Sequence, residues 1–202
     1  MTKIKFCGLS RYCDIIYANE SKPEYIGFVF AAKSKRRVTP EKAKELKKLL
    51  SPDILAVGVF SDDDIEMIAG LLENGTIDIA QLHGSEDENY IKHLKTLAGK
   101  PVIKAFCIKS EEDVRKAESS PADYILLDSG SGTGRTFDWE LIKNIKRPYF
   151  LAGGLTPENA EKAVSKLHPF ALDVSSGIET GEVKDKTKMA AFAAAVRKED
   201  RL

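Results

Sequence analysis

Short apolar runs recur along the whole chain, roughly one every 25 residues, and they constrain the fold more than any other feature. Most of them are continuous instead of alternating with polar residues, which is typical of parallel strands covered on both faces. The runs predict eight strands, at Ile4–Cys7, Tyr25–Phe30, Leu55–Phe60, Ile77–Leu82, Val102–Cys107, Tyr124–Asp128, Tyr149–Ala152 and Ala171–Val174.

Helix-start signals lie between these runs. The segments 39–42 and 156–159 each combine a threonine N-cap, a proline at the first helical position and an acid in the first turn. They predict helices that end at about Leu50 and about Leu167. Serine followed by acids predicts further helix starts at 61–64, 85–88 and 110–113, and an alanine-rich segment predicts a helix over 184–198.

The alternation of strands and helices predicts an α/β fold with parallel strands. Eight units favour a (β/α)8 TIM barrel that forms one domain over residues 1–202, since no linker interrupts the chain. The alternative is an open doubly wound sheet. Such a sheet would be expected to carry a glycine-rich fingerprint after its first strand, and Cys7-Gly-Leu-Ser10 does not supply it.

Charge and composition exclude several classes of protein. Lys and Arg together number 31, as do Asp and Glu, so the formal net charge is zero and we expect no nucleic-acid partner. No apolar run approaches the roughly 18 residues of a membrane span, and the N-terminus has no signal-peptide pattern, so we expect a cytoplasmic protein. The cation-rich segment 33–37 is either a solvated loop or an anchor for a small anion.

Three cysteines, without a CxxC pair, predict neither a disulfide framework nor a metal site. Barrel active sites lie at the carboxyl ends of the strands. Cys7 and Asp128 end the first and sixth predicted strands, so they could face one small substrate across the barrel mouth. A thiolate can act as a base and a carboxylic acid as a proton donor on one substrate. Each residue also has a structural interpretation: Cys7 as a small core residue and Asp128 as a cap for the following loop.

The last two strand ends favour phosphate binding. Glycine lets backbone amides approach a ligand, and the loops after the seventh and eighth strands commonly bind phosphate in this fold. We therefore expect a phosphate site that is formed by Gly153, Gly154, Ser175, Ser176 and Gly177. The alternative is that these glycines only make tight turns.

Other strand-end residues have two interpretations as well. Arg36 and Arg37 follow the second strand, and an arginine fork matches a carboxylate, but only one of two neighbours can readily point into the barrel mouth. Asp173 is either a second site carboxylate or a cap for the Ser-Ser-Gly turn. His83 is more often a turn residue than a catalyst at such a place.

Several of these segments together resemble the phosphoribosylanthranilate isomerase family along nearly the full chain. The motifs that carry the resemblance are Lys5-Phe-Cys-Gly8, Gly27-Phe-Val-Phe30, Ser34-Lys-Arg-Arg37, Gln81-Leu-His-Gly84, Gly132-Thr-Gly-Arg-Thr-Phe-Asp-Trp139, Leu151-Ala-Gly-Gly-Leu-Thr-Pro-Glu-Asn159 and Asp173-Val-Ser-Ser-Gly177. The family's usual Cys-Gly-Ile-Thr is Cys7-Gly-Leu-Ser10 in this chain, and the stretch 128–134 is short for the family.

The resemblance implies an Amadori rearrangement of N-(5-phosphoribosyl)anthranilate in tryptophan biosynthesis, without a cofactor or metal. By that likeness Asp128 is the general acid and Cys7 the base, Arg36 binds the anthranilate carboxylate, and Asp173 contacts the anthranilate nitrogen. The glycine and serine loops would bind the phosphate. The alternatives are another phosphate-binding barrel enzyme, such as indole glycerol phosphate synthase, and a non-catalytic phosphosugar-binding barrel. Whether the protein is a monomer or a homodimer stays open.

Overall fold

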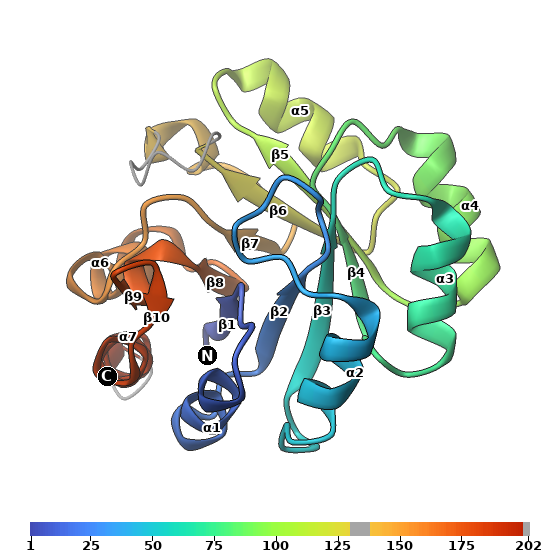
Figure 1. Ribbon diagram of the computed structural model, residues 1–202. Helices are drawn as coiled ribbons and strands as arrows, with labels where there is room; N and C mark the ends of the chain where they lie inside the picture. Colours follow the sequence, from blue (N-terminus) through green and yellow to red (C-terminus); the bar gives the residue numbers. More distant parts are fainter. Residues whose placement is uncertain (130–137, 200–202) are drawn as a thin grey trace.

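A computed structural model of the protein describes residues 1–129 and 138–199 and shows a closed barrel (Figure 1). All eight strands are parallel, and pairing of β1 with β8 closes the barrel. The strands are β1 (Lys3–Cys7), β2 (Tyr25–Val29), β3 (Leu55–Phe60), β4 (Ile79–Leu82), β5 (Val102–Cys107), β6 (Tyr124–Asp128), β7 (Tyr149–Leu151) and β8 (Ala171–Val174). The barrel prediction is confirmed, with strand ends that differ by at most two residues.

Helices surround the barrel. The α-helices are α1 (Tyr12–Ser21), α2 (Pro40–Lys47), α3 (Ile65–Glu73), α4 (Glu88–Ala98), α5 (Glu111–Ser119), α6 (Pro157–Leu167) and α7 (Lys186–Glu199). The ring closes where α7 packs against both α6 and α1 (Figure 1). None of the helices in the described ranges is long and apolar enough to cross a membrane.

The helix predictions are mostly confirmed, with corrections to the cap of α4, the end of α2 and the start of α7. The segment 85–88 contains the start of α4 at Glu88, as expected, but Ser85 is not its cap: the Asp87 carboxylate accepts from the amide of Tyr90, and the Ser85 hydroxyl donates to Asp62. Helix α2 ends at Lys47, earlier than expected. Between β6 and β7 the described residues contain only a 3₁₀ helix, η1 (Trp139–Ile142); residues 132–137 of the motif 132–139 lie outside the described residues.

A small β-hairpin precedes the C-terminal helix and shifts the start of that helix to a later residue than expected. β9 (Glu179–Thr180) pairs with β10 (Val183–Lys184), following the 3₁₀ helix η2 (Ser176–Ile178). The turn between them places Gly181 and Glu182 at φ of 56° and 64°, a conformation that glycine adopts without strain. As a result α7 begins at Lys186 instead of Lys184, and Glu179 and Lys184 are held side by side.

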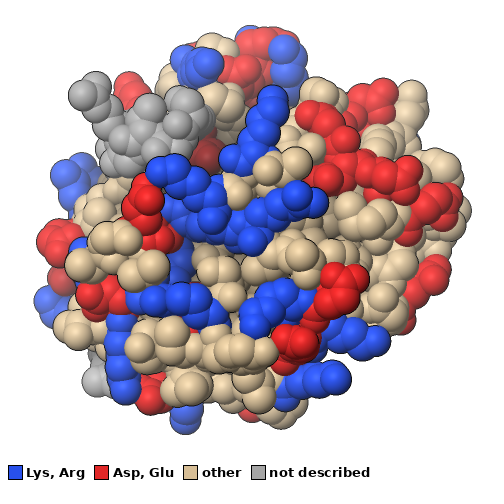
Figure 2. Space-filling model, in the orientation of Figure 1, with Lys and Arg blue, Asp and Glu red and all other residues tan. Residues whose placement is uncertain are grey.

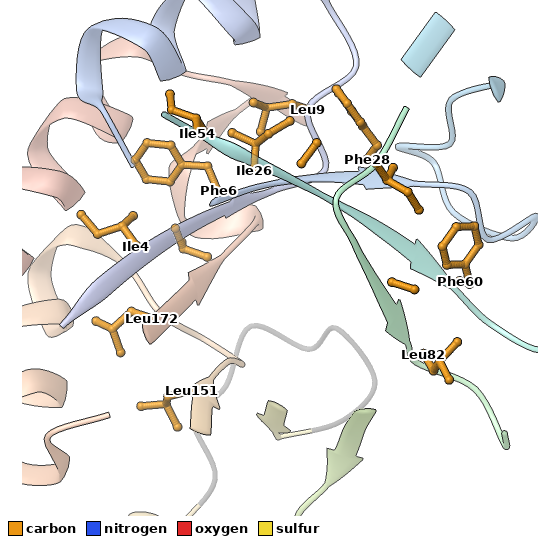
Figure 3. Packing of buried hydrophobic residues seen from close by; sticks show 14 of the residues in the cluster. Ile4, Phe6, Leu9, Ile26, Phe28, Ile54, Phe60, Leu82, Leu151 and Leu172 are labelled. Atoms are coloured by element: carbon orange, nitrogen blue, oxygen red, sulfur yellow. The ribbon is translucent and has the colours of Figure 1, made fainter. Parts of the chain in front are cut away.

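Alternation along each strand separates two cores. Outward residues such as Ile4, Phe6 and Phe28 pack between the strands and the helices (Figure 3). Inward residues of the barrel form a second cluster, which includes Tyr25 and Phe150. Burying a Phe side chain stabilises a fold by roughly 1.5–3 kcal/mol, so the outer core fixes the strands firmly. Consequently the residues at their carboxyl ends are well positioned.

Candidate active site

A pocket of about 200 Å³ opens at the carboxyl ends of the strands. The side chains of β1, β4, β6 and β8 and the loops after β7 and β8 line it. Seven of the nine predicted site residues are among the lining residues: Cys7, Asp128, Gly153, Gly154, Asp173, Ser175 and Ser176. Arg36 and Gly177 are not. The structure therefore brings the proposed acid and base of the sequence analysis to one cavity.

Cys7 ends β1 with its side chain directed into the barrel, where it packs with Val29 and Val59. It is only 9% exposed, so burial raises the pKa of the thiol, and the charge of Lys5 opposes that effect. A Cβ on Gly27 would lie 2.8 Å from the Cys7 Sγ. Glycine at that position therefore leaves the room that the thiol occupies.

Lys5 and Asp173, which lines the pocket, form a buried ion pair. The Lys5 Nζ donates to the Asp173 Oδ1 at 2.9 Å, and the Lys5 side chain is fully buried. Burial favours the neutral amine, but the charges of Asp173 and Cys7 and the hydrogen bonds to both together outweigh it and raise the pKa of Lys5. Lys5 is thus a cation inside the barrel, two residues before Cys7 on the same inward face.

Asp128, at the end of β6, lies in a chain of polar side chains. The Nε2 of His83 is 3.5 Å from the Asp128 Oδ2, and the Nδ1 of His83 is 3.3 Å from the Gln81 Nε2. When the Gln81 amide donates to Nδ1, a neutral imidazole carries its proton on Nε2, toward Asp128. His83 follows β4 in a loop and lines the pocket, so its side chain lies beside Asp128.

Gln81 is itself notable as a buried amide inside the barrel. It is 1% exposed and lines the pocket, and its Oε1 has no hydrogen-bond partner among the described residues. A buried acceptor without a partner costs free energy, about 1–3 kcal/mol. The oxygen is therefore available to a donor that enters the pocket, such as a hydroxyl group.

The glycine loops have the backbone geometry expected of an anion site. Gly153 and Gly154 adopt φ of 90° and 65°, and a Cβ on Gly153 would lie 2.7 Å from the Asp128 Oδ1. A Cβ on Gly177 would lie 1.9 Å from the Leu155 carbonyl oxygen, so that position admits only glycine. Gly177 thus joins the two loops by close packing, although it does not itself line the pocket.

Arg36 lies at the pocket rim and forms a bidentate ion pair. Its Nε and Nη2 donate to the Glu179 carboxylate at 2.7 and 2.6 Å, which raises the pKa of Arg36. Its Cδ lies 2.4 Å from the point that a Cβ on Gly8 would occupy, so its stem crosses the loop after Cys7. Lys184 donates to the same carboxylate at 2.5 Å.

Lys and Arg side chains gather over the middle of the face that Figures 1 and 2 show. Figure 2 shows Lys and Arg side chains there, where Figure 1 places the loop between β2 and α2. Arg37 is exposed in this loop, whereas Arg36 is partly buried. A small anion that approaches the pocket therefore meets positive charge first. Among the described residues, no group of three His, Cys, Asp or Glu side chains is placed to hold a metal ion.

Four residues near the pocket were not singled out from the sequence: Lys5, Gln81, Glu179 and Lys184. The sequence held a signal for Lys5 and Gln81: each lies two positions before a residue at a strand end, Cys7 and His83, and side chains two positions apart on a strand point to the same face. The last two depend on the hairpin, for which only the Thr180-Gly-Glu182 turn was a signal.

Comparison with known proteins matches residues 4–195 to the family model for N-(5'-phosphoribosyl)anthranilate (PRA) isomerase. The relative of that name from Endomicrobium trichonymphae is 46% identical over 194 residues, which cover 94% of this chain and 95% of the relative. The relative from Caldanaerobacter subterraneus is 43% identical over 204 residues, with 98% of each chain covered.

Solved structures agree with this match. The crystal structure of phosphoribosyl anthranilate isomerase from Thermotoga maritima superposes with a TM-score of 0.89 at 34% identity, covering 98% of this chain and all of that one. Another isomerase structure holds reduced 1-(o-carboxyphenylamino)-1-deoxyribulose 5-phosphate and gives a TM-score of 0.88 at 34% identity over the same shares.

Proposed function

This chain belongs to the N-(5'-phosphoribosyl)anthranilate isomerase family, and we propose that Cys7 and Asp128 catalyse its reaction in the pocket described above. The reaction is the Amadori rearrangement of N-(5-phosphoribosyl)anthranilate to 1-(2-carboxyphenylamino)-1-deoxyribulose 5-phosphate in tryptophan biosynthesis. The observation that carries the assignment is that a thiol and a carboxyl group from strands β1 and β6 line one cavity beside two glycine and serine loops.

Asp128 begins the reaction as a general acid. It gives its proton to the furanose ring oxygen, the bond between that oxygen and C1 breaks, and the anthranilate nitrogen forms a protonated Schiff base with C1. The Nε2–H of His83, 3.5 Å from the Asp128 Oδ2, stabilises the carboxylate that this step leaves.

Cys7 completes the reaction as a base. Its thiolate removes the proton from C2, and the electron pair moves into the C1–C2 bond to neutralise the iminium nitrogen. The resulting enolamine takes a proton at C1 and gives up the proton of its C2 hydroxyl, which yields the ketone. The rearrangement gains and loses no atoms, so the residues need only move protons.

Arg36 binds the anthranilate carboxylate in this proposal. Glu179 occupies the Nε and Nη2 edge of the guanidinium, so two of its five N–H donors are engaged. No hydrogen bond within residues 1–129 and 138–199 engages Nη1, so Nη1 and the second Nη2 proton can bind another carboxylate in a bidentate arrangement. Asp173, whose Oδ1 accepts from Lys5, lines the pocket and accepts a hydrogen bond from the anthranilate nitrogen.

The phosphate is held by the loops after β7 and β8. Gly153 and Gly154 present backbone amides, and Ser176 is exposed at the pocket wall and presents its hydroxyl. Ser175 contributes its backbone amide, because its hydroxyl already donates to the Cys7 carbonyl oxygen. Gly177 supports the site through its close packing on Leu155. A thiol base also suits a reducing compartment, so we place the enzyme in the cytoplasm.

Of the alternatives, indole glycerol phosphate synthase would require a lysine acid at a strand end. Lys104 does not serve, because its Nζ is bonded to the Glu86 carboxylate and the Gly84 carbonyl oxygen, both at 2.7 Å. A non-catalytic phosphosugar sensor would give no turnover. Rescue of a tryptophan auxotroph that lacks the isomerase tests the proposal directly. We expect growth with the parent gene and none with Cys7→Ala; failure of both, with folded protein present, would contradict the activity.

A further inference from the structure

The surroundings of Cys7 hold more charge than an acid–base pair requires. Lys5 is fully buried inside the barrel, although burying an ammonium group is costly and a hydrophobic residue would fill the same space. The Asp173 Oδ1 accepts one hydrogen bond from the Lys5 Nζ, at 2.9 Å. An ammonium group has three donors, so Lys5 can bond to a second group as well.

The second group is the Cys7 thiol. The point that a Cβ on Gly27 would occupy lies 2.8 Å from the Cys7 Sγ and 3.3 Å from the Lys5 Nζ. Both atoms therefore border the same space, which the missing side chain of Gly27 leaves open. The two residues lie two positions apart on β1, so their side chains point to the same face of the strand.

Charges on the pocket rim extend this arrangement. Lys184, itself buried, bonds to the Ser175 carbonyl oxygen at 2.9 Å and to Glu179, and the Ser175 hydroxyl donates to the Cys7 carbonyl oxygen. We call the surrounding groups the Cys7 charge cluster. The Cys7 charge cluster consists of three cations and two carboxylates: Lys5, Arg36, Lys184, Asp173 and Glu179.

The balance of this cluster depends on the state of the sulfur. When the three cations are protonated and both carboxylates are ionised, a neutral thiol leaves one positive charge in excess and a thiolate leaves none; the cluster therefore opposes the effect of burial, which still raises the pKa of Cys7 overall. A low-dielectric site strongly disfavours an unbalanced charge. The side chains of Asp128 and His83, which line the same pocket from other strands, are paired with each other at 3.5 Å.

We propose that Lys5 is a positioning residue whose ammonium group holds the Cys7 thiolate, and that Asp173 limits this effect by sharing the same cation. The inference deepens the proposed function, since it explains how a buried thiol supplies a base. Burial raises the pKa of Cys7, and the Lys5 charge lowers it while that of Asp173 raises it. Removing the charge of Lys5 should therefore raise the pKa of Cys7, and removing that of Asp173 should lower it.

The test measures thiol ionisation and does not use turnover. In a Cys13→Ser/Cys107→Ser background Cys7 is the only thiol, and its alkylation by iodoacetamide is followed against pH. Lys5→Met should move the profile to higher pH by roughly one to three units. Asp173→Asn should move it to lower pH. Lys3→Met is the matched control, two residues earlier on β1 beside Phe170, and should leave it unchanged.

If Lys5→Met does not fold, Lys5→Gln keeps a donor for Asp173 while it removes the charge, and it should shift the profile in the same direction. An unchanged alkylation profile in a folded Lys5 variant, or equal shifts in Lys3→Met, would overturn the proposal. A shifted profile together with an active Cys7→Ala enzyme would instead support the Lys5 inference and contradict Cys7 as the base.

Discussion

The two ends of the barrel interior differ sharply although the same eight strands build both. At the amino end, aromatic rings pack edge to face: the centroids of Tyr25 and Phe150 lie 5.4 Å apart, and those of Tyr124 and Phe150 lie 5.9 Å apart. At the carboxyl end, the interior holds a buried lysine, carboxylates and the Gln81 amide, whose oxygen has no hydrogen-bond partner in the part of the chain that the structure describes. One end is an apolar core and the other is a polar cavity.

This difference separates stability from chemistry. Aromatic pairs gain free energy from burial and from their geometry, whereas a buried ion pair such as Lys5–Asp173 is weak evidence for stability because desolvation opposes it. The amino end and the outer core must therefore hold the fold while the carboxyl end tolerates unfavourable burial. Substitutions at the two ends should have different consequences, one on turnover and the other on unfolding.

Cys7→Ala gives the largest expected effect, and it acts on turnover. Without the thiolate no described group replaces the base, so kcat should fall by about 10⁴-fold, the upper end of what a general base contributes. The small side chain fits the space, and thermal unfolding should change little. Steady-state kinetics and calorimetry on the same preparation check both parts; kcat within a few-fold of the parent would exclude Cys7 as the base.

Phe150→Ala should produce the opposite pattern at the amino end. Phe150 is fully buried and contacts Tyr25, Tyr124 and Phe170, so its removal leaves a cavity that costs about 3–5 kcal/mol of unfolding free energy. The kcat of the protein that remains folded should stay within about twofold, because the ring does not line the pocket. Urea unfolding, with kinetics at low urea, measures the two; a large loss of kcat in folded protein would show that the two ends are coupled.

The amino end and the outer core were largely predictable from the sequence. Continuous apolar runs and helix-start signals require only local physics, and parallel pairing follows from the alternation of strands and helices. Predictions were wrong where tertiary contacts decide. Ser85 looks like a cap, yet the Asp62 carboxylate accepts its hydroxyl, and Asp87 caps α4 instead.

The carboxyl end was predictable only in part. Strand ends and family motifs located Cys7 and Asp128, because barrel sites lie at that end. The pairing of Arg36 with Glu179 joins residues 143 positions apart, and Lys5 with Asp173 joins residues 168 apart. No local pattern in the sequence specifies such long-range pairs, so the charges around the thiol became visible only in the structure.

Asp128→Asn should lower kcat by about 10²-fold or more while KM changes little, since the amide keeps the shape and loses the acidic proton. The parent kcat/KM should be bell-shaped against pH. The variant should lose the falling basic limb and keep one limb that rises with pH, because only Cys7 must then ionise. Burial raises the pKa of Cys7, so that limb should have its midpoint above the ordinary thiol value. An unimpaired rate at every pH would leave Asp128 as a loop cap.

Arg36→Met gives the smallest of these effects and tests the rim of the polar end. A carboxylate distant from the reacting bonds contributes similar binding in the ground and transition states, so KM should rise more than kcat falls. Losing a charged hydrogen-bond pair costs about 1.5–3 kcal/mol, which corresponds to a rise in KM of roughly 10- to 150-fold. Lys35→Met is the matched control from the same loop, because Lys35 pairs with the exposed Glu182 and should leave KM unchanged. Should Arg37→Met carry the binding defect instead, the carboxylate would belong to the exposed neighbour.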